Sequence, residues 1–278
     1  MFRLLQYEIV KMFLKKRTLL GFLIVAVIVP LVEVTMKIEG GHFLQMATRS
    51  LQRDFFFVGN LFNGWLVSHQ MMNSLWFHIP LLISFVAGDQ LAGEATAGTY
   101  RLILIRPVSR TKIFFAKYAA SVIYTVAFVG FLGLLSVGLA LALLGGGNLL
   151  VIERTLLLLP ADDVAWRFLV GYLLAMWSML TIASLAFFFS SFVENAIGPI
   201  IATMGVLIIF QIVTFLPLEA FNSVRPYLFT PYLNLWQRVF AYPVAWEEVA
   251  KGASCLGAYS IASVLAAWVI FVRKDILS

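Results

Sequence analysis

The chain has 278 residues, of which 62% are hydrophobic and 12% are charged. A soluble domain carries about 25% charged residues, so this composition excludes one large water-soluble core and indicates a membrane protein. The formal net charge of +6 does not indicate nucleic-acid binding, because the basic residues lie beside apolar runs and not on one basic face.

The N-terminal segment, residues 1–17, separates into two faces on a helical wheel. The apolar face carries Phe2, Leu5, Ile9, Met12 and Phe13. The polar face carries Glu8, Lys11 and Lys15. This pattern suits a helix that lies in the membrane interface, and it equally suits a plain basic flank to the first span.

Six apolar runs follow, each near the length of about 20 residues that a transmembrane helix needs. They are residues 18–34, 65–87, 118–144, 168–189, 196–216 and 252–272. Glu33 lies at the edge of the first run, so no span is expected to hold a charge at its centre. The expected fold is therefore all-α, a single polytopic transmembrane domain.

The segments between the runs are more polar. Gly145-Gly146-Gly147-Asn148 is a strong helix breaker, and a loop containing Glu153, Asp162 and Asp163 is expected after it. Residues 219–251 are rich in proline and aromatic residues, which is typical of interfacial or re-entrant structure.

The basic residues predict the orientation. Six spans place both termini on one side, and that side carries 12 Lys and Arg residues, against 8 on the other side in longer segments. By the positive-inside rule, both termini and the loop 88–117 are cytoplasmic. We expect a multi-pass protein of the cell (inner) membrane, in contact with lipid.

The loop at residues 88–117 holds several helix start and stop signals. Asp89 is expected to N-cap a helix over 90–97, and Gly98 to end it in the left-handed conformation. Thr99 is a candidate N-cap for a second short helix over 100–105, which Pro107 prevents from continuing. Ser109 is the candidate cap of the helix that enters the third span.

The second short helix is unusual in its composition. Leu102, Ile103, Leu104 and Ile105 are too apolar for a solvated loop, so they should be buried against the bundle or against another protein. Spacing alone leaves open an ordinary connecting loop with basic anchors.

The run GEATAGTYRLILIRPVSRTKIFFAK resembles the corresponding loop of the ABC-2 family of ABC transporter permeases. That family shows a Glu, a Gly-Thr pair, a leucine-rich turn, a Pro-Val/Ile-Ser-Arg stretch and a Lys that opens the next span. The matching positions here are Glu94, Gly98, Thr99, Leu102, Leu104, Pro107, Ser109, Arg110 and Lys117. Six spans, an N-terminal segment containing Glu8 and a basic C-terminus are similar to the family as well.

The resemblance implies a permease that pairs with a second copy or a related permease. It also implies two cytoplasmic ATPase subunits, which bind ATP and receive a coupling helix located between spans two and three. The implied activity is ATP-driven export of a hydrophobic or amphipathic compound. The residues expected to couple to the ATPase are Glu94, Gly98, Thr99, Arg101, Leu102, Ile105, Arg106, Pro107 and Arg110.

The chain itself lacks the phosphate-binding G-x-x-x-x-G-K-[ST] motif, so hydrolysis is expected in a separate subunit and no cofactor is expected here. The alternative is an ATP-independent transporter or channel component, which often carries charges in mid-span. An intramembrane enzyme would need a cluster such as H-E-x-x-H, and none is present. His69 and His78 lie about 180° apart on a helix, and the only cysteine is Cys255, so no catalytic or metal site is expected.

Overall fold

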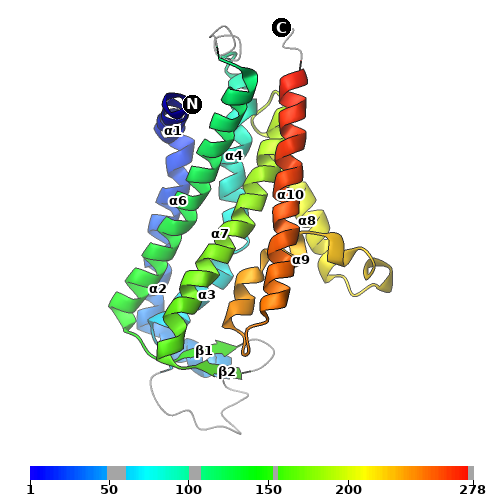
Figure 1. Cartoon of the computed structure of the whole chain (residues 1–278). Helices are drawn as coiled ribbons and strands as arrows, with labels where there is room; N and C mark the ends of the chain where they lie inside the picture. Colours follow the sequence, from blue (N-terminus) through cyan, green and yellow to red (C-terminus); the bar gives the residue numbers. More distant parts are fainter. Residues whose placement is uncertain (49–60, 100–107, 153–155, 275–278) are drawn as a thin grey trace.

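The structure is a computed structural model that describes residues 1–48, 61–99, 108–152 and 156–274. Long helices run between two ends of the molecule (Figure 1). One end carries α1 (Phe2–Leu14), the C-terminal end of α4 (His78–Thr96) and the C-terminal end of α10 (Trp246–Arg273). A two-stranded sheet lies at the other end.

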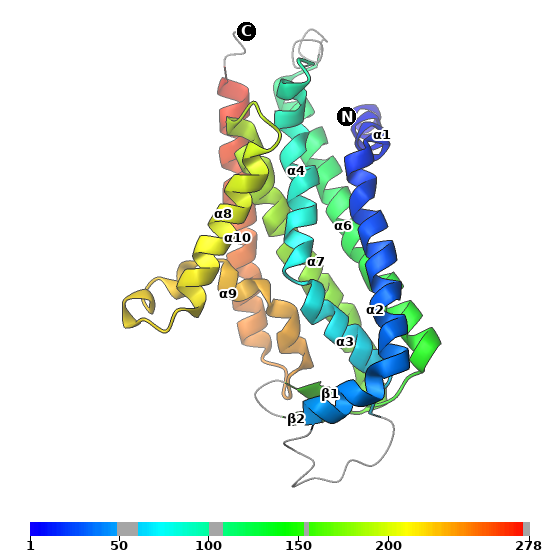
Figure 2. The same cartoon turned by 180° about the vertical axis from the view of Figure 1, so that it is seen from behind.

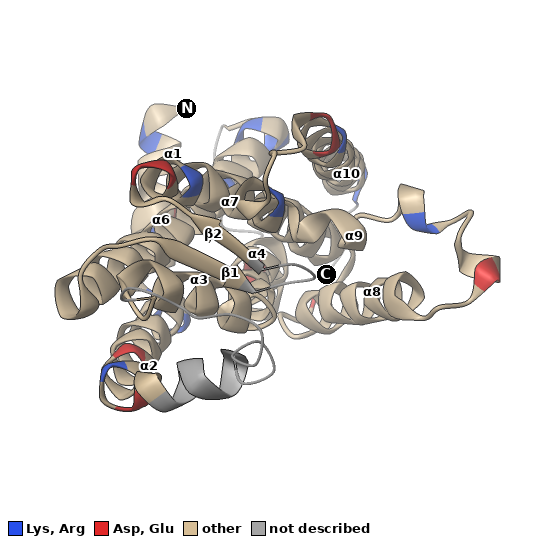
Figure 3. Ribbon diagram, turned by 90° about the horizontal axis from the view of Figure 1, so that it is seen from below, with Lys and Arg blue, Asp and Glu red and all other residues tan. Residues whose placement is uncertain are grey.

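The long apolar helices confirm a multi-pass membrane protein at the level of length and composition. Five helices in the described chain are long and apolar enough to cross a membrane. They are α2 (Lys16–Thr48), α6 (Arg110–Leu144), α7 (Ala161–Phe192), α8 (Gly198–Phe215) and α10. Viewed along the helices, the ribbons carry few charged residues (Figure 3).

The expected second span is broken. Helices α3 (Gly64–Leu75) and α4 together pass the test for a sixth span, but they are bent by 56° at a short break. Pro80 lies in the first turn of α4, and its ring denies a hydrogen bond to the carbonyl four residues earlier, that of Trp76. The break therefore falls where the proline removes a helical hydrogen bond.

The first span is longer than its apolar run suggests. Helix α2 continues to Thr48 with Pro30 inside it, so it runs 14 residues beyond the end of the expected span at Val34. Glu33 consequently lies inside the helix and not at its edge, and its side chain is completely buried. This corrects the expectation that the spans carry charges only at their ends.

The all-α expectation needs one further correction. Strands β1 (Leu149–Ile152) and β2 (Leu156–Leu159) form an antiparallel hairpin in which Leu149 pairs with Leu159. The Gly-rich breaker ends α6, and apolar residues of the hairpin are then buried in one cluster with residues of α3 and α7, namely Leu149, Leu150, Val151 and Leu159. Asp162 and Asp163 lie in the first turn of α7 and not in a loop, while residues 153–155 lie outside the described chain.

The aromatic segment between α8 and α10 divides into two parts. The first contains the short helices η1 (Glu219–Phe221) and η2 (Arg225–Tyr227) and stands away from the bundle (Figures 2 and 3). The second contains α9 (Thr230–Leu233) and η3 (Leu235–Phe240), which fold back onto α7. Trp236 and Phe240 are buried there, whereas Tyr227 and Tyr242 are exposed.

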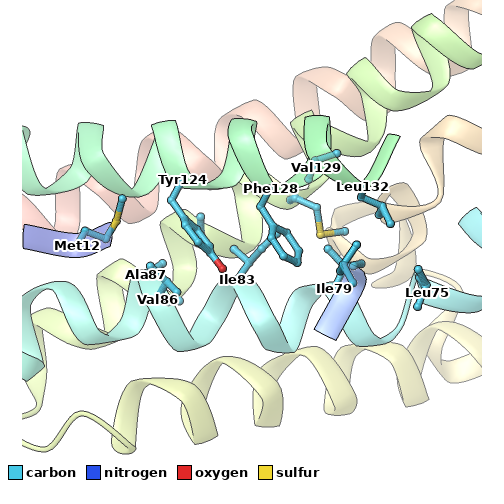
Figure 4. Close-up of a cluster of buried hydrophobic side chains, with 14 of the residues drawn as sticks. Met12, Leu75, Ile79, Ile83, Val86, Ala87, Tyr124, Phe128, Val129 and Leu132 are labelled. Atoms are coloured by element: carbon cyan, nitrogen blue, oxygen red, sulfur yellow. The ribbon is translucent and has the colours of Figure 1, made fainter. Parts of the chain in front are cut away.

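The largest core cluster lies between α6 and the bent pair α3–α4. Tyr124 and Phe128 of α6 face Ile79 and Ile83 of α4, and Met12 of α1 closes one end of the cluster (Figure 4). Helix α1 is thus packed into the bundle core. The core ends one helical turn from Glu8, where a group of buried charges begins.

Candidate functional site

Glu94, in the last turn of α4, is the centre of a buried group of charges. Its side chain is 3% exposed. One carboxylate oxygen accepts hydrogen bonds from Lys11 Nζ at 2.5 Å and from Lys117 Nζ at 2.8 Å. The other accepts a hydrogen bond from the Thr99 hydroxyl. Several donors thus stabilise the charged form of this carboxylate.

Lys117 links three helices through the same group. Its ammonium, on α6, also donates to Glu8 of α1 at 2.8 Å. The side chains of Glu8, Lys117 and Glu94 are all 3% exposed or less. Removing one member of such a buried pair leaves the charge of its partner buried and unpaired. An unpaired buried charge is strongly destabilising. The group therefore holds α1, α4 and α6 in one arrangement.

Asp89 extends the charged group toward the junction of α1 and α2. It accepts hydrogen bonds from Lys15 Nζ at 2.6 Å and from Arg17 at 3.2 Å. Asp89 is buried, while Arg17 is mostly exposed. Three carboxylates and four cations thus alternate along one end of the molecule, and we call these seven residues the charged cluster. Its members are Glu8, Lys11, Lys15, Arg17, Asp89, Glu94 and Lys117.

The length of α6 makes such a cluster tolerable in a membrane protein. Its 35 residues span about 52 Å at 1.5 Å per residue, whereas the hydrocarbon core is about 30 Å thick. Lys117 lies in the second turn of α6, about 10 Å from its start. The helix is therefore long enough to carry this lysine outside the hydrocarbon region.

The charged cluster shows what the polar face of the N-terminal segment contacts. Glu8 is buried, and Lys11 and Lys15 point to partners on α4. Phe2 and Leu14 are among the exposed residues of α1, at 72% and 77%. A helical wheel separates polar from apolar side chains, but it does not tell whether the polar face meets water or complementary charges.

Helices α7 and α8 hold the same end of α4 from another side. The Ser190 hydroxyl donates to Gly88 O at 2.5 Å and accepts from the backbone N–H groups of Leu91 and Ala92. The Thr96 hydroxyl donates to Glu194 O at 2.8 Å and accepts from Ala196 N at 3.2 Å. The C-terminal part of α4 is thus bonded to the end of α7 and to the turn between α7 and α8.

Gly98 and Asp89 were both expected to bound a short helix in the loop, and only the expectation for Gly98 is confirmed. Gly98 follows α4 with φ of +65°, which confirms the left-handed end that its position predicts. The expected N-cap role of Asp89 is wrong, because α4 runs through it without interruption and its side chain is used in ion pairs. The carboxylate pairs with Lys15 and Arg17, which come from the junction of α1 and α2.

Thr99 and Arg110 flank the segment 100–107. Thr99 bonds back to α4, with its N–H donating to Glu94 O at 3.1 Å. Arg110 donates to the carbonyl oxygens of Val272 and Lys274 at 3.1 and 2.9 Å. Ser109 stands at the N-cap position of α6, without a side-chain hydrogen bond to the helix. The other expected coupling residues lie outside the described chain, and they are Arg101, Leu102, Ile105, Arg106 and Pro107.

Sequence reasoning missed most of the charged cluster. It singled out Glu94, and it matched Lys117 to the family motif without a physical role. The available signal was the presence of Asp89, Glu94 and Lys117 next to apolar runs, in a chain with few charges. Charged residues at such positions are expected to have partners. Glu8 and Lys117 are far apart in the chain, so no pattern of local spacing predicts that they form a pair.

Comparison with known proteins gives a family. A search of curated proteins found no match. The family model described as a protein of unknown function, DUF2705, matches residues 23–277. This match covers almost the whole chain, from α2 to the C-terminus, and the chain therefore belongs to the DUF2705 family.

Proposed function

We propose that this protein is the permease subunit of an ATP-driven ABC exporter of the ABC-2 type. In this proposal it works with two separate cytoplasmic ATPase subunits and with a second permease copy or a related permease. The cargo is a hydrophobic or amphipathic compound. The support is the sequence resemblance of the loop together with the charged cluster at the base of that loop.

The observation that carries the proposal is the buried Glu8–Lys117–Glu94 group. A coupling segment must pass its displacement to the spans, and rigid contacts at both of its ends do this better than loose loops. Lys117 joins α6, which follows the segment, to α4, which precedes it. Arg110 joins the start of α6 to the end of α10.

A mechanism follows from these contacts. ATP binding draws the two ATPase subunits together and displaces the segment between Gly98 and Ser109. The ends of α4 and α6 move with it as one unit, because the charged cluster joins them to each other and to α1. The contacts of Ser190 and Thr96 carry the displacement to α7 and α8. The bundle then changes the side on which it is open.

The test is a Leu102→Asp variant, produced in the native host with an affinity tag. A charge on the apolar face of the coupling segment should prevent docking, so the ATPase should no longer co-purify while the permease stays in the membrane. The matched control is Leu158→Asp, on an exposed position of the hairpin at the other end of the molecule. The proposal fails if no ATPase co-purifies with the unaltered chain, or if Leu102→Asp retains it at the control level.

An ATP-independent transporter or channel component is the second candidate. Glu33 favours it, because a buried carboxyl group inside a span is a common element of ion pathways. Transport by the purified chain in vesicles without any nucleotide would support this candidate against the first.

A further inference from the structure

Three buried polar groups meet inside the bundle without a hydrogen bond of good geometry between them. In the described structure, both carboxylate oxygens of Glu33, the Ser136 hydroxyl and the Tyr172 hydroxyl are buried and form no hydrogen bond of acceptable geometry. The Ser136 hydroxyl nevertheless lies next to the Glu33 carboxyl group and next to the Tyr172 hydroxyl. Buried polar groups are normally satisfied, so this group is an exception that calls for an explanation.

The three residues come from three helices far apart in sequence. Glu33 belongs to α2, Ser136 to α6 and Tyr172 to α7. Ser68 of α3 adds a contact, since its hydroxyl donates to Ser136 O at 3.3 Å. Because these residues come from three separate helices, tertiary packing brings them together. We call Glu33, Ser136 and Tyr172 the polar triad.

No basic side chain of the described chain neutralises Glu33. Lys37 lies one turn further along α2, but it is exposed and forms no ion pair with Glu33. An unpaired carboxylate inside a membrane protein is expensive and marks a substrate or ion pathway by default. A ligand that brings its own positive charge would stabilise the charged form of this buried carboxyl group.

An apolar groove lies directly beside the triad. It has a volume of about 300 Å³ and is formed by α6 and α7, which run side by side in Figure 1. Its lining is almost entirely apolar and includes Val129, Gly130, Gly133, Phe168 and Leu169. Ligand sites are typically concave and apolar, with few polar groups that fix the orientation of the ligand.

Tyr172 connects the groove to the carboxyl group. Its ring forms part of the groove wall and packs against Gly133, where an added Cβ would lie 3.0 Å from the ring. Its hydroxyl is shielded from the surface and lies on the side of Ser136 and Glu33. Tyr172 is thus the residue that the groove and the carboxyl group of Glu33 have in common.

We propose that the polar triad and the adjacent groove form an intramembrane binding site for a lipophilic organic cation. The apolar body of the ligand occupies the groove between α6 and α7, and its cationic group is directed to Glu33 past the side chain of Tyr172. A lipophilic organic cation would then be the substrate class of the proposed exporter, and this part of the inference rests on the proposed function. Binding itself requires neither ATP nor the ATPase.

The experiment measures binding of tetraphenylphosphonium to the purified full-length chain in an uncharged detergent, by equilibrium dialysis. The unaltered chain should bind this cation saturably and in preference to tetraphenylborate, an anion of the same shape. Glu33→Gln should weaken binding of the cation about tenfold or more, which corresponds to about 1.4 kcal/mol. Glu39→Gln removes the same charge from an exposed position of α2 and should leave the affinity unchanged.

Two outcomes overturn the proposal. One is equal affinity of the unaltered chain for the cation and the anion, a measurement that does not depend on whether any variant folds. The other is a folded Glu33→Gln variant that binds the cation as well as Glu39→Gln does. Because the measurement omits the ATPase, a negative result here leaves the Leu102→Asp test of the proposed function untouched, and the reverse holds as well.

Discussion

At the scale of single residues, Lys117 has the most consequential position in the structure. It is the only cation in contact with Glu8 in the described chain, and it shares Glu94 with Lys11. Its surroundings are closed to water, with a side-chain exposure of 2%. Such a residue determines whether two carboxylates can coexist in a buried place.

We predict that Lys117→Met destabilises the chain by about 3–5 kcal/mol, the usual cost of breaking a buried ion pair from one side. The cause is the unpaired charge of Glu8. Thermal unfolding in detergent, followed by far-ultraviolet circular dichroism, measures the change. Lys16→Met is the control, because Lys16 is exposed.

The double variant Lys117→Met with Glu8→Gln separates this cause from a general loss of packing. It should be more stable than Lys117→Met alone, since the stranded charge is gone. A double variant that is as unstable as the single one would show that the ion pair contributes little.

At the scale of elements, the apolar runs predicted where the long helices lie, but they did not predict the break between α3 and α4. The apolar runs located the spans, and Gly145 ended α6 as its left-handed tendency predicts. Proline was ambiguous, because Pro30 lies within a continuous helix while Pro80 accompanies a break. The presence of a proline alone therefore does not predict whether a helix continues through it or breaks beside it.

The charged cluster was hidden for a similar reason. Glu8 and Lys117 are 109 positions apart in the chain, so no spacing rule relates them. The cap expected at Asp89 followed a correct local rule, but Lys15 and Arg17, distant in the chain, pair with that carboxylate instead. The helix that Thr99 was expected to cap lies outside the described chain. Local signals therefore located the end of α4 at Gly98 without showing what that end contacts.

The crossing of α3 and α6 gives a prediction at this scale. A Cβ on Gly64 would lie 2.6 Å from Ala140 O, a backbone atom that cannot move aside. Gly64→Ala should therefore destabilise the chain by about 1–3 kcal/mol through overpacking. Gly205→Ala is the matched control on α8, where nothing lies within 4 Å, and equal melting temperatures for the two variants would contradict the close crossing.

At the scale of the whole molecule, the two ends of the bundle differ in what they carry. One end holds the charged cluster, α1 and the end of α10, and the other holds the hairpin and η3 (Figure 1). The positive-inside rule predicts that the first end is cytoplasmic. The single cysteine of the chain makes this testable.

In a Cys255→Ser background, we predict that Leu158→Cys reacts with a membrane-impermeant maleimide on intact cells. Arg3→Cys should react only after the membrane is permeabilised, because α1 lies at the opposite end. Both positions are exposed, so a difference in labelling reports on the side of the membrane. The reverse labelling pattern would invert the orientation and remove the basis for an ATPase near Gly98.

The 56° bend between α3 and α4 has a mechanical consequence for the molecule. Across Trp76 and Phe77 the ladder of helical hydrogen bonds is already interrupted, so a change of tilt there alters a few backbone torsions and ruptures no continuous ladder. The half next to α6 at Gly64 can keep its place while α4, which ends at Thr96, changes its tilt. In the proposed permease, displacement at the end that carries the charged cluster would then precede rearrangement at the end that carries the hairpin, so that the two ends would not open together.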